Sequence, residues 1–114
     1  MTTKIEEFSS FREKMNEIIL RKGTLGIKRF FALDTQTYSA GALSLKVKEL
    51  LGLVASLVLR CNDCITYHTL QCYELGVTEE EFYDAFTVAL VVGGSIVIPH
   101  LRNAVDILEE CIQR

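Results

Sequence analysis

Two helical patterns follow one another in residues 44–76, SLKVKELLGLVASLVLRCNDCITYHTLQCYELG. Ser44 is suited to cap a helix that runs to about Leu59, along which apolar residues recur at helical spacing. The next helix is predicted from Cys61–Asn62 to Gly76, and glycine commonly stands just after the C-terminus of a helix. The sequence therefore predicts two successive helices, with a cysteine at the start of the second.

The helical pattern continues on both sides of this stretch. Upstream, apolar spacing predicts a helix over Ile5–Arg21, and a short apolar stretch, Ile27–Thr37, follows. Downstream, Thr78–Glu81 matches a capping box that opens another helix, and Gly93–Gly94 breaks or kinks it. Pro99 fits the first turn of the last helix. Because no convincing stretch alternates with period two, we expect an all-α fold, a compact bundle of about five to six helices.

Length and composition narrow the class of protein. The chain has 114 residues, a length that suits a single domain over residues 1–114. Its 49% of hydrophobic residues are enough to form a hydrophobic core. The net charge is −3 and no large basic cluster occurs, so we expect no nucleic-acid partner. The polar N-terminus does not resemble a signal peptide, and the longest apolar stretch falls short of the about 18 residues that span a membrane. We therefore expect a cytoplasmic protein that does not enter membranes.

The chain contains four cysteines, two of which are only three residues apart. Cys72 and Cys111 lie on apolar helical stripes, where a cysteine usually packs as a small buried hydrophobe. The closely spaced pair is Cys61 and Cys64. In a cytosolic protein this arrangement favours redox chemistry or metal binding over a framework of structural disulfides.

Cys61, Cys64 and His68 fall on one face of the predicted helix. The N-terminal turn of a helix stabilises a thiolate, and an imidazole one turn further on can take a thiol proton. Asp63 opposes this effect because its negative charge disfavours a nearby thiolate. A zinc site would require four ligands, and His100 is far along the chain, where we expect a structural or surface role. Redox chemistry is therefore favoured over metal binding and over plain packing.

Glu49 stands at the edge of the apolar face of the preceding helix. An exposed carboxylate is one interpretation. The other is that Glu49 folds back onto His68, orients the imidazole and accepts its proton, as the third member of a catalytic triad does. The residues alone leave both interpretations open.

Four segments together resemble the carboxymuconolactone decarboxylase family. They are Gly41–Leu50, the Cys61–Cys64 motif with a histidine four residues later, Gly76–Glu81 and Gly93–Gly94. Within the family, the branch with two closely spaced cysteines is similar to alkylhydroperoxidase D. That resemblance implies an all-helical obligate oligomer, a homotrimer or homohexamer, that reduces hydroperoxides with an external dithiol and needs no metal or other cofactor.

The resemblance also implies a role for each site residue. Cys64 would be the peroxidatic cysteine and Cys61 the resolving one, while Glu49 and His68 would form a proton relay. Asp63 departs from the pattern, which has a histidine at this position. The decarboxylation of a lactone, from which the family takes its name, is an alternative function. A non-enzymatic helical module that senses redox state or holds a metal is another.

Overall fold

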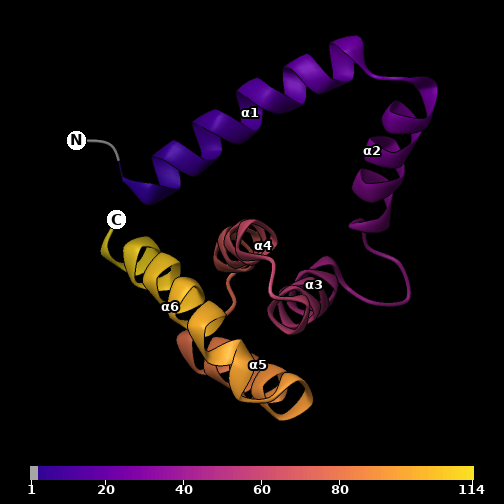
Figure 1. Cartoon of the computed structure of the whole chain (residues 1–114). Helices are drawn as coiled ribbons and strands as arrows, with labels where there is room; N and C mark the ends of the chain where they lie inside the picture. The colour runs from indigo at the N-terminus through magenta and orange to yellow at the C-terminus, as the bar shows by residue number, and fades with distance from the viewer. Residues whose placement is uncertain (1–2) are drawn as a thin grey trace. The chain divides into compact units, whose positions relative to one another are not determined.

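The computed structural model describes residues 3–114, in which the secondary structure consists of helices and no strand occurs. The helices are, in chain order, α1 (Lys4–Lys22), α2 (Leu25–Thr37), α3 (Leu45–Leu59), α4 (Asn62–Glu74), α5 (Glu79–Gly93), the 3₁₀ helix η1 (Ser95–Val97) and α6 (Ile98–Gln113) (Figure 1). The predicted all-α fold of about five to six helices is confirmed, with six α-helices among the described residues. Within residues 3–114 we find no helix whose length and hydrophobicity would allow it to span a membrane.

The chain divides into two compact units, of which the first ends at Ser39. This unit contains α1 and α2. Thr3 caps α1 in a reciprocal capping box with Glu6, and the Thr24 hydroxyl accepts a hydrogen bond from the Ile27 N–H at 3.3 Å to cap α2. The apolar stretch predicted after the first helix is therefore itself a helix. A single domain over the whole chain stays a prediction.

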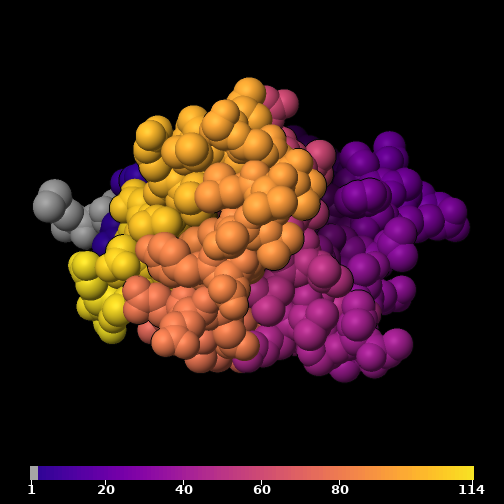
Figure 2. All heavy atoms as spheres, turned by 90° about the horizontal axis from the view of Figure 1, so that it is seen from below, coloured from indigo at the N-terminus to yellow at the C-terminus, as the bar shows by residue number. Residues whose placement is uncertain are grey.

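The second unit runs from Ala40 to Arg114 and contains α3 to α6. In Figure 1, α4 lies between α3 and α6, and it contacts both, while α5 packs against α3. On the face drawn in Figure 2, α5 and α6 (orange to yellow) reach the surface. The apolar core of this unit consists of Leu53, Leu57, Ile65, Cys72, Val77, Phe82, Phe86, Ala89, Val97, Ala104 and Leu108. Each fully buried large side chain in it contributes about 1.5–3 kcal/mol to folding.

The helix boundaries of the second unit follow the caps predicted from the sequence. The Ser44 hydroxyl accepts a hydrogen bond from the Val47 N–H at 3.2 Å at the start of α3. Gly76 follows the C-cap of α4 with φ +82°, and Gly94 ends α5 with φ +83°. Both values lie in the region that residues with a Cβ avoid, which explains why glycine stands at each position. Pro99 occupies the first turn of α6, as predicted.

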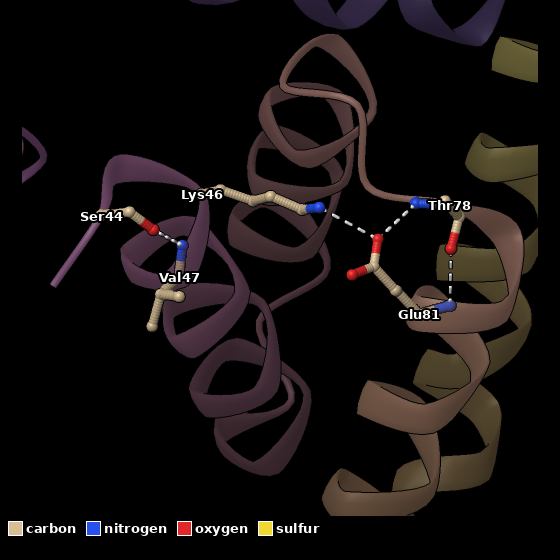
Figure 3. Close-up of polar contacts among 5 residues, drawn as sticks. All are labelled: Ser44, Lys46, Val47, Thr78 and Glu81. Carbon is tan, nitrogen blue, oxygen red and sulfur yellow. Dashed lines mark hydrogen bonds and ion pairs between the residues drawn. The ribbon is translucent and has the colours of Figure 1, made fainter.

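A polar contact links the start of α3 to the start of α5 (Figure 3). The Lys46 Nζ lies 3.1 Å from a carboxylate oxygen of Glu81. Glu81 also accepts the Thr78 N–H at 2.9 Å and donates its own N–H to the Thr78 hydroxyl at 3.1 Å, which completes the predicted capping box. The hydrogen bond from the Thr78 N–H and the ammonium of Lys46 lower the pKa of Glu81 from its usual value of 4.5.

We predict that this contact makes the folding stability of the protein depend on pH in the acidic range. Because the pKa of Glu81 is lower in the folded protein than in the unfolded chain, its contribution is complete above pH 4.5 and is lost as the pH falls through the folded-state value. Glu81→Gln should lower the melting temperature at neutral pH, and this difference from the wild type should shrink in acid. Thermal melts monitored by circular dichroism test this, with Glu80→Gln as the charge-matched control. A difference that stays constant with pH would contradict the prediction.

Candidate functional site

The two closely spaced cysteines lie at the N-terminus of α4. Cys61 is the N-cap residue, and its sulfur accepts a hydrogen bond from the Cys64 N–H at 3.2 Å. The two cysteines form a disulfide, with their Cα atoms 5.3 Å apart. Cys64 is exposed and Cys61 is half-buried. The unpaired N–H groups of this first turn favour negative charge, so the same turn can stabilise a thiolate after reduction.

Arg60 makes the sharp connection that brings Cys61 to this position. It is the only non-glycine residue among those described with a positive φ, +60°, in the left-handed region. Its N–H donates to the Leu57 carbonyl oxygen, and the Cys61 N–H donates to the Ser56 carbonyl oxygen, each at 3.1 Å. These two bonds end α3, and α4 begins after only two residues, Arg60 and Cys61. No sequence pattern indicated this conformation, because arginine has no special preference for it.

His68 and Glu49 form a buried hydrogen bond between α4 and α3. Their Nδ1 and Oε2 atoms are 3.0 Å apart, and the residues are only 9% and 2% exposed. Of the two interpretations of Glu49, the structure agrees with the one that folds it onto His68. An ionised carboxylate can only accept, so Nδ1 carries the hydrogen in this pair, and in the neutral form of the ring Nε2 is then the nitrogen that can accept a proton. This tautomer therefore places a proton acceptor, Nε2 of His68, on the helix that begins at the two cysteines.

Cys72 lies one further turn along α4 and is completely buried. Burial, followed by the negative charge of Glu49, raises the pKa of its thiol from 9.0 to about 12. A thiol with this pKa stays protonated at neutral pH and is a poor nucleophile. Cys111 is also buried, and burial raises the pKa of its thiol as well. Both positions agree with the prediction that these cysteines are packing residues.

Two further polar residues, Asp63 and His100, contribute to the surroundings of the first turn of α4. Asp63 is exposed in the first turn of α4, where a carboxylate favours the helix but disfavours a thiolate. The His100 Nδ1 lies 2.8 Å from the Asn62 Oδ1, so it contacts the residue that follows Cys61. Sequence reasoning missed this contact, since 38 residues separate the two. Among residues 3–114, no three His, Cys, Asp or Glu side chains form a group that could hold a metal ion.

Comparison with known proteins gives one family. The sequence profile of the Carboxymuconolactone decarboxylase family matches residues 27–109, a range that includes all four candidate residues. A protein from Paracoccus denitrificans, "Uncharacterized protein 4 in cox locus", is 28% identical over 81 residues, which cover 71% of this chain and 73% of that protein.

Solved structures agree with this match. A carboxymuconolactone decarboxylase family protein from Thermotoga maritima, described with a possible involvement in antioxidative response, is 54% identical and superposes with a TM-score of 0.90. The alignment covers 94% of this chain and 91% of that one. A family protein from Legionella pneumophila shares the fold at 22% identity, with a TM-score of 0.87 over 96% of this chain and 98% of its own.

We predict that the Glu49–His68 hydrogen bond stabilises the second unit. Removing one partner of a buried hydrogen bond leaves the other unsatisfied, which costs about 1–3 kcal/mol and more where a charge is involved. Glu49→Ala should therefore lower the free energy of unfolding by about 2 kcal/mol or more, measured by urea denaturation. Glu74→Ala removes an exposed carboxylate from the same unit and should change it by no more than about 0.5 kcal/mol. Equal effects of the two variants would show that the hydrogen bond has no net stabilising effect.

Proposed function

Because this chain belongs to the carboxymuconolactone decarboxylase family, we propose that it is a thiol-dependent hydroperoxide reductase of the kind that the resemblance to alkylhydroperoxidase D implied. The observation that carries the proposal is the buried hydrogen bond between Glu49 and His68. His68 belongs to α4, the helix that begins at the Cys61–Cys64 pair. A buried histidine held by a carboxylate can move a proton, and the neighbouring cysteines can exchange electrons. The possible antioxidative involvement of the Thermotoga maritima protein is in keeping with this function.

In the proposed reaction, Cys64 is the cysteine that attacks the peroxide. His68 takes the proton from the Cys64 thiol, and Glu49 stabilises the resulting imidazolium. The thiolate attacks one oxygen of the hydroperoxide, so that an S–O bond forms and the O–O bond breaks. The departing alkoxide takes the proton back from His68 and leaves as an alcohol, while Cys64 becomes a sulfenic acid. The exposure of Cys64 supports this assignment, because the substrate has to reach the attacking sulfur.

Cys61 then resolves the sulfenic acid. Its sulfur attacks that of Cys64, water leaves, and the disulfide seen in the structure forms. An external dithiol reduces this disulfide by thiol–disulfide exchange and restores two thiols. The sum is one hydroperoxide and one dithiol converted into an alcohol, water and an external disulfide. We place the reaction in the cytoplasm, where dithiol reductants are available, and we expect Asp63 to slow it by disfavouring the thiolate.

Peroxide consumption in the presence of a dithiol reductant tests the proposal. We expect Cys64→Ser to reduce the rate to the uncatalysed background, because it removes the attacking sulfur. Cys61→Ser should consume one equivalent and then slow. His68→Asn should lower the rate by about 10²–10⁴-fold, as the loss of a general base does. Cys111→Ala, which removes a cysteine outside the proposed reaction, should keep the wild-type rate. Equal rates in the wild type, Cys64→Ser and Cys61→Ser would refute the mechanism.

We also propose that the chain works as a homo-oligomer. Large apolar side chains are exposed in both units, among them Phe30 on α2, which is 68% exposed, and Val91 near the end of α5, which is 80% exposed. No residue of α2 is buried, and an isolated helix of 13 residues is marginally stable in water. Contact with further copies of the chain would bury these side chains and stabilise α2.

The predicted assembly is a trimer or hexamer. Multi-angle light scattering at micromolar concentration should give three or six times the 12.9 kDa mass of the chain. Phe30→Glu should reduce the mass, since it places a charge in the proposed contact, while Glu13→Gln on α1 should leave it unchanged. A monomeric wild-type protein would contradict this proposal.

A further inference from the structure

The N-terminus of α6 holds the first turn of α4 through the residue that follows Cys61. The His100 Nδ1–H donates to the Asn62 Oδ1, with 2.8 Å between the two atoms. The Asn103 amide, one turn further along α6, lies 3.4 Å from the Asn62 carbonyl oxygen and donates to the Thr66 hydroxyl at 3.2 Å. Thr66 donates to the same carbonyl oxygen at 2.9 Å. Asn62 is therefore held by its side chain and by its backbone.

We infer that His100 is a positioning residue for the Cys61–Cys64 pair, acting through Asn62. His100 is half-buried, Asn62 is exposed, and neither belongs to the apolar core. Asn62 is the first residue of α4, so its orientation sets the geometry of the turn in which the Cys61 sulfur meets the Cys64 N–H. The inference deepens the proposed function and rests on the redox activity of the pair that this function requires.

The hydrogen bonds from His100 and Asn103 on α6 to the first turn of α4 matter to different extents in the two redox states of the pair. In the oxidised state the disulfide closes the first turn covalently. In the reduced state this covalent link is absent, so the turn depends more on its hydrogen bonds, of which α6 supplies those to Asn62 and Thr66. The Cys64 N–H also binds more strongly to a Cys61 thiolate than to a disulfide sulfur, provided that the turn keeps its geometry. Loss of these hydrogen bonds from α6 should therefore destabilise the reduced state more than the oxidised state.

The dithiol–disulfide equilibrium of the pair against glutathione tests this inference without any peroxide. In this reaction two glutathione thiols reduce the Cys61–Cys64 disulfide to two thiols, and one glutathione disulfide forms. His100→Ala should shift the equilibrium about three- to tenfold towards the protein disulfide, the range expected for the loss of one hydrogen bond. The pH profile of alkylation of the reduced pair should move to higher pH, because the thiolate is less stabilised.

Three further variants separate positioning from other roles. His100→Asn keeps an N–H donor where Nδ1 lies and should restore the wild-type equilibrium. Asn62→Ala removes the acceptor and should match His100→Ala, with no additional shift in the double variant. Arg102→Ala, an exposed substitution on the same turn of α6, should change neither readout. Melting of His100→Ala and Asn62→Ala in both redox states should show a larger loss of stability in the reduced state, whereas His100→Asn and Arg102→Ala should melt like the wild type.

The outcomes are distinct from those of the peroxidase assay. Equilibria of His100→Ala and Asn62→Ala within twofold of the wild type would overturn the inference, as would a His100→Asn variant that behaves like His100→Ala. If the wild type exchanges with glutathione but consumes no peroxide, the proposed function fails while the positioning role is still decided by the equilibrium.

Discussion

A carboxylate with only 2% of its surface exposed needs a partner, and in this chain the partner of Glu49 is His68. Burial of an unpaired charge costs several kcal/mol, so the two residues have to meet if α3 and α4 are to pack. The bond of 3.0 Å between them sets which turn of α3 faces which turn of α4. It also orients the imidazole on the helix that begins with the Cys61–Cys64 pair. One buried hydrogen bond thus serves both the packing of two helices and the geometry of the site.

The sequence predicted much of the fold because helix ends depend on local chemistry. Hydroxyl N-caps such as Ser44 and Thr78 bind N–H groups only three residues away, so a short stretch of sequence suffices to identify them. Gly76 and Gly94 likewise mark positions where the backbone needs a positive φ. Arg60 also has a positive φ without being glycine, and no local pattern indicated it. Its geometry follows from the requirement that α3 and α4 pack with two residues between them.

The candidate site was less predictable because its parts come from three helices. Cys61, Cys64 and His68 share one helix, and helical periodicity alone grouped them. The position of Glu49 remained undecided from the residues, since a carboxylate at the edge of an apolar face can turn towards water or towards the core. The pairing of His100 with Asn62 depends on the packing of α6 on α4, across 38 residues of chain. Such contacts follow from tertiary register, which no local pattern encodes.

The way in which α4 is held makes this helix a suitable place for the proposed chemistry. Besides apolar residues, α4 buries Thr66, His68 and Thr69, so a good part of its inner surface is polar. Two of these side chains have specific partners, one on each side of α4: Glu49 on α3 binds His68, while Asn103 on α6 binds Thr66. The buried Thr69 hydroxyl has no hydrogen-bond partner among the described residues. Hydrogen bonds constrain direction as well as distance, whereas apolar packing constrains mainly volume. A helix fixed in this way holds its N-terminal turn in one orientation, and the proposed alternation of the two cysteines between a disulfide and two thiols requires such a support.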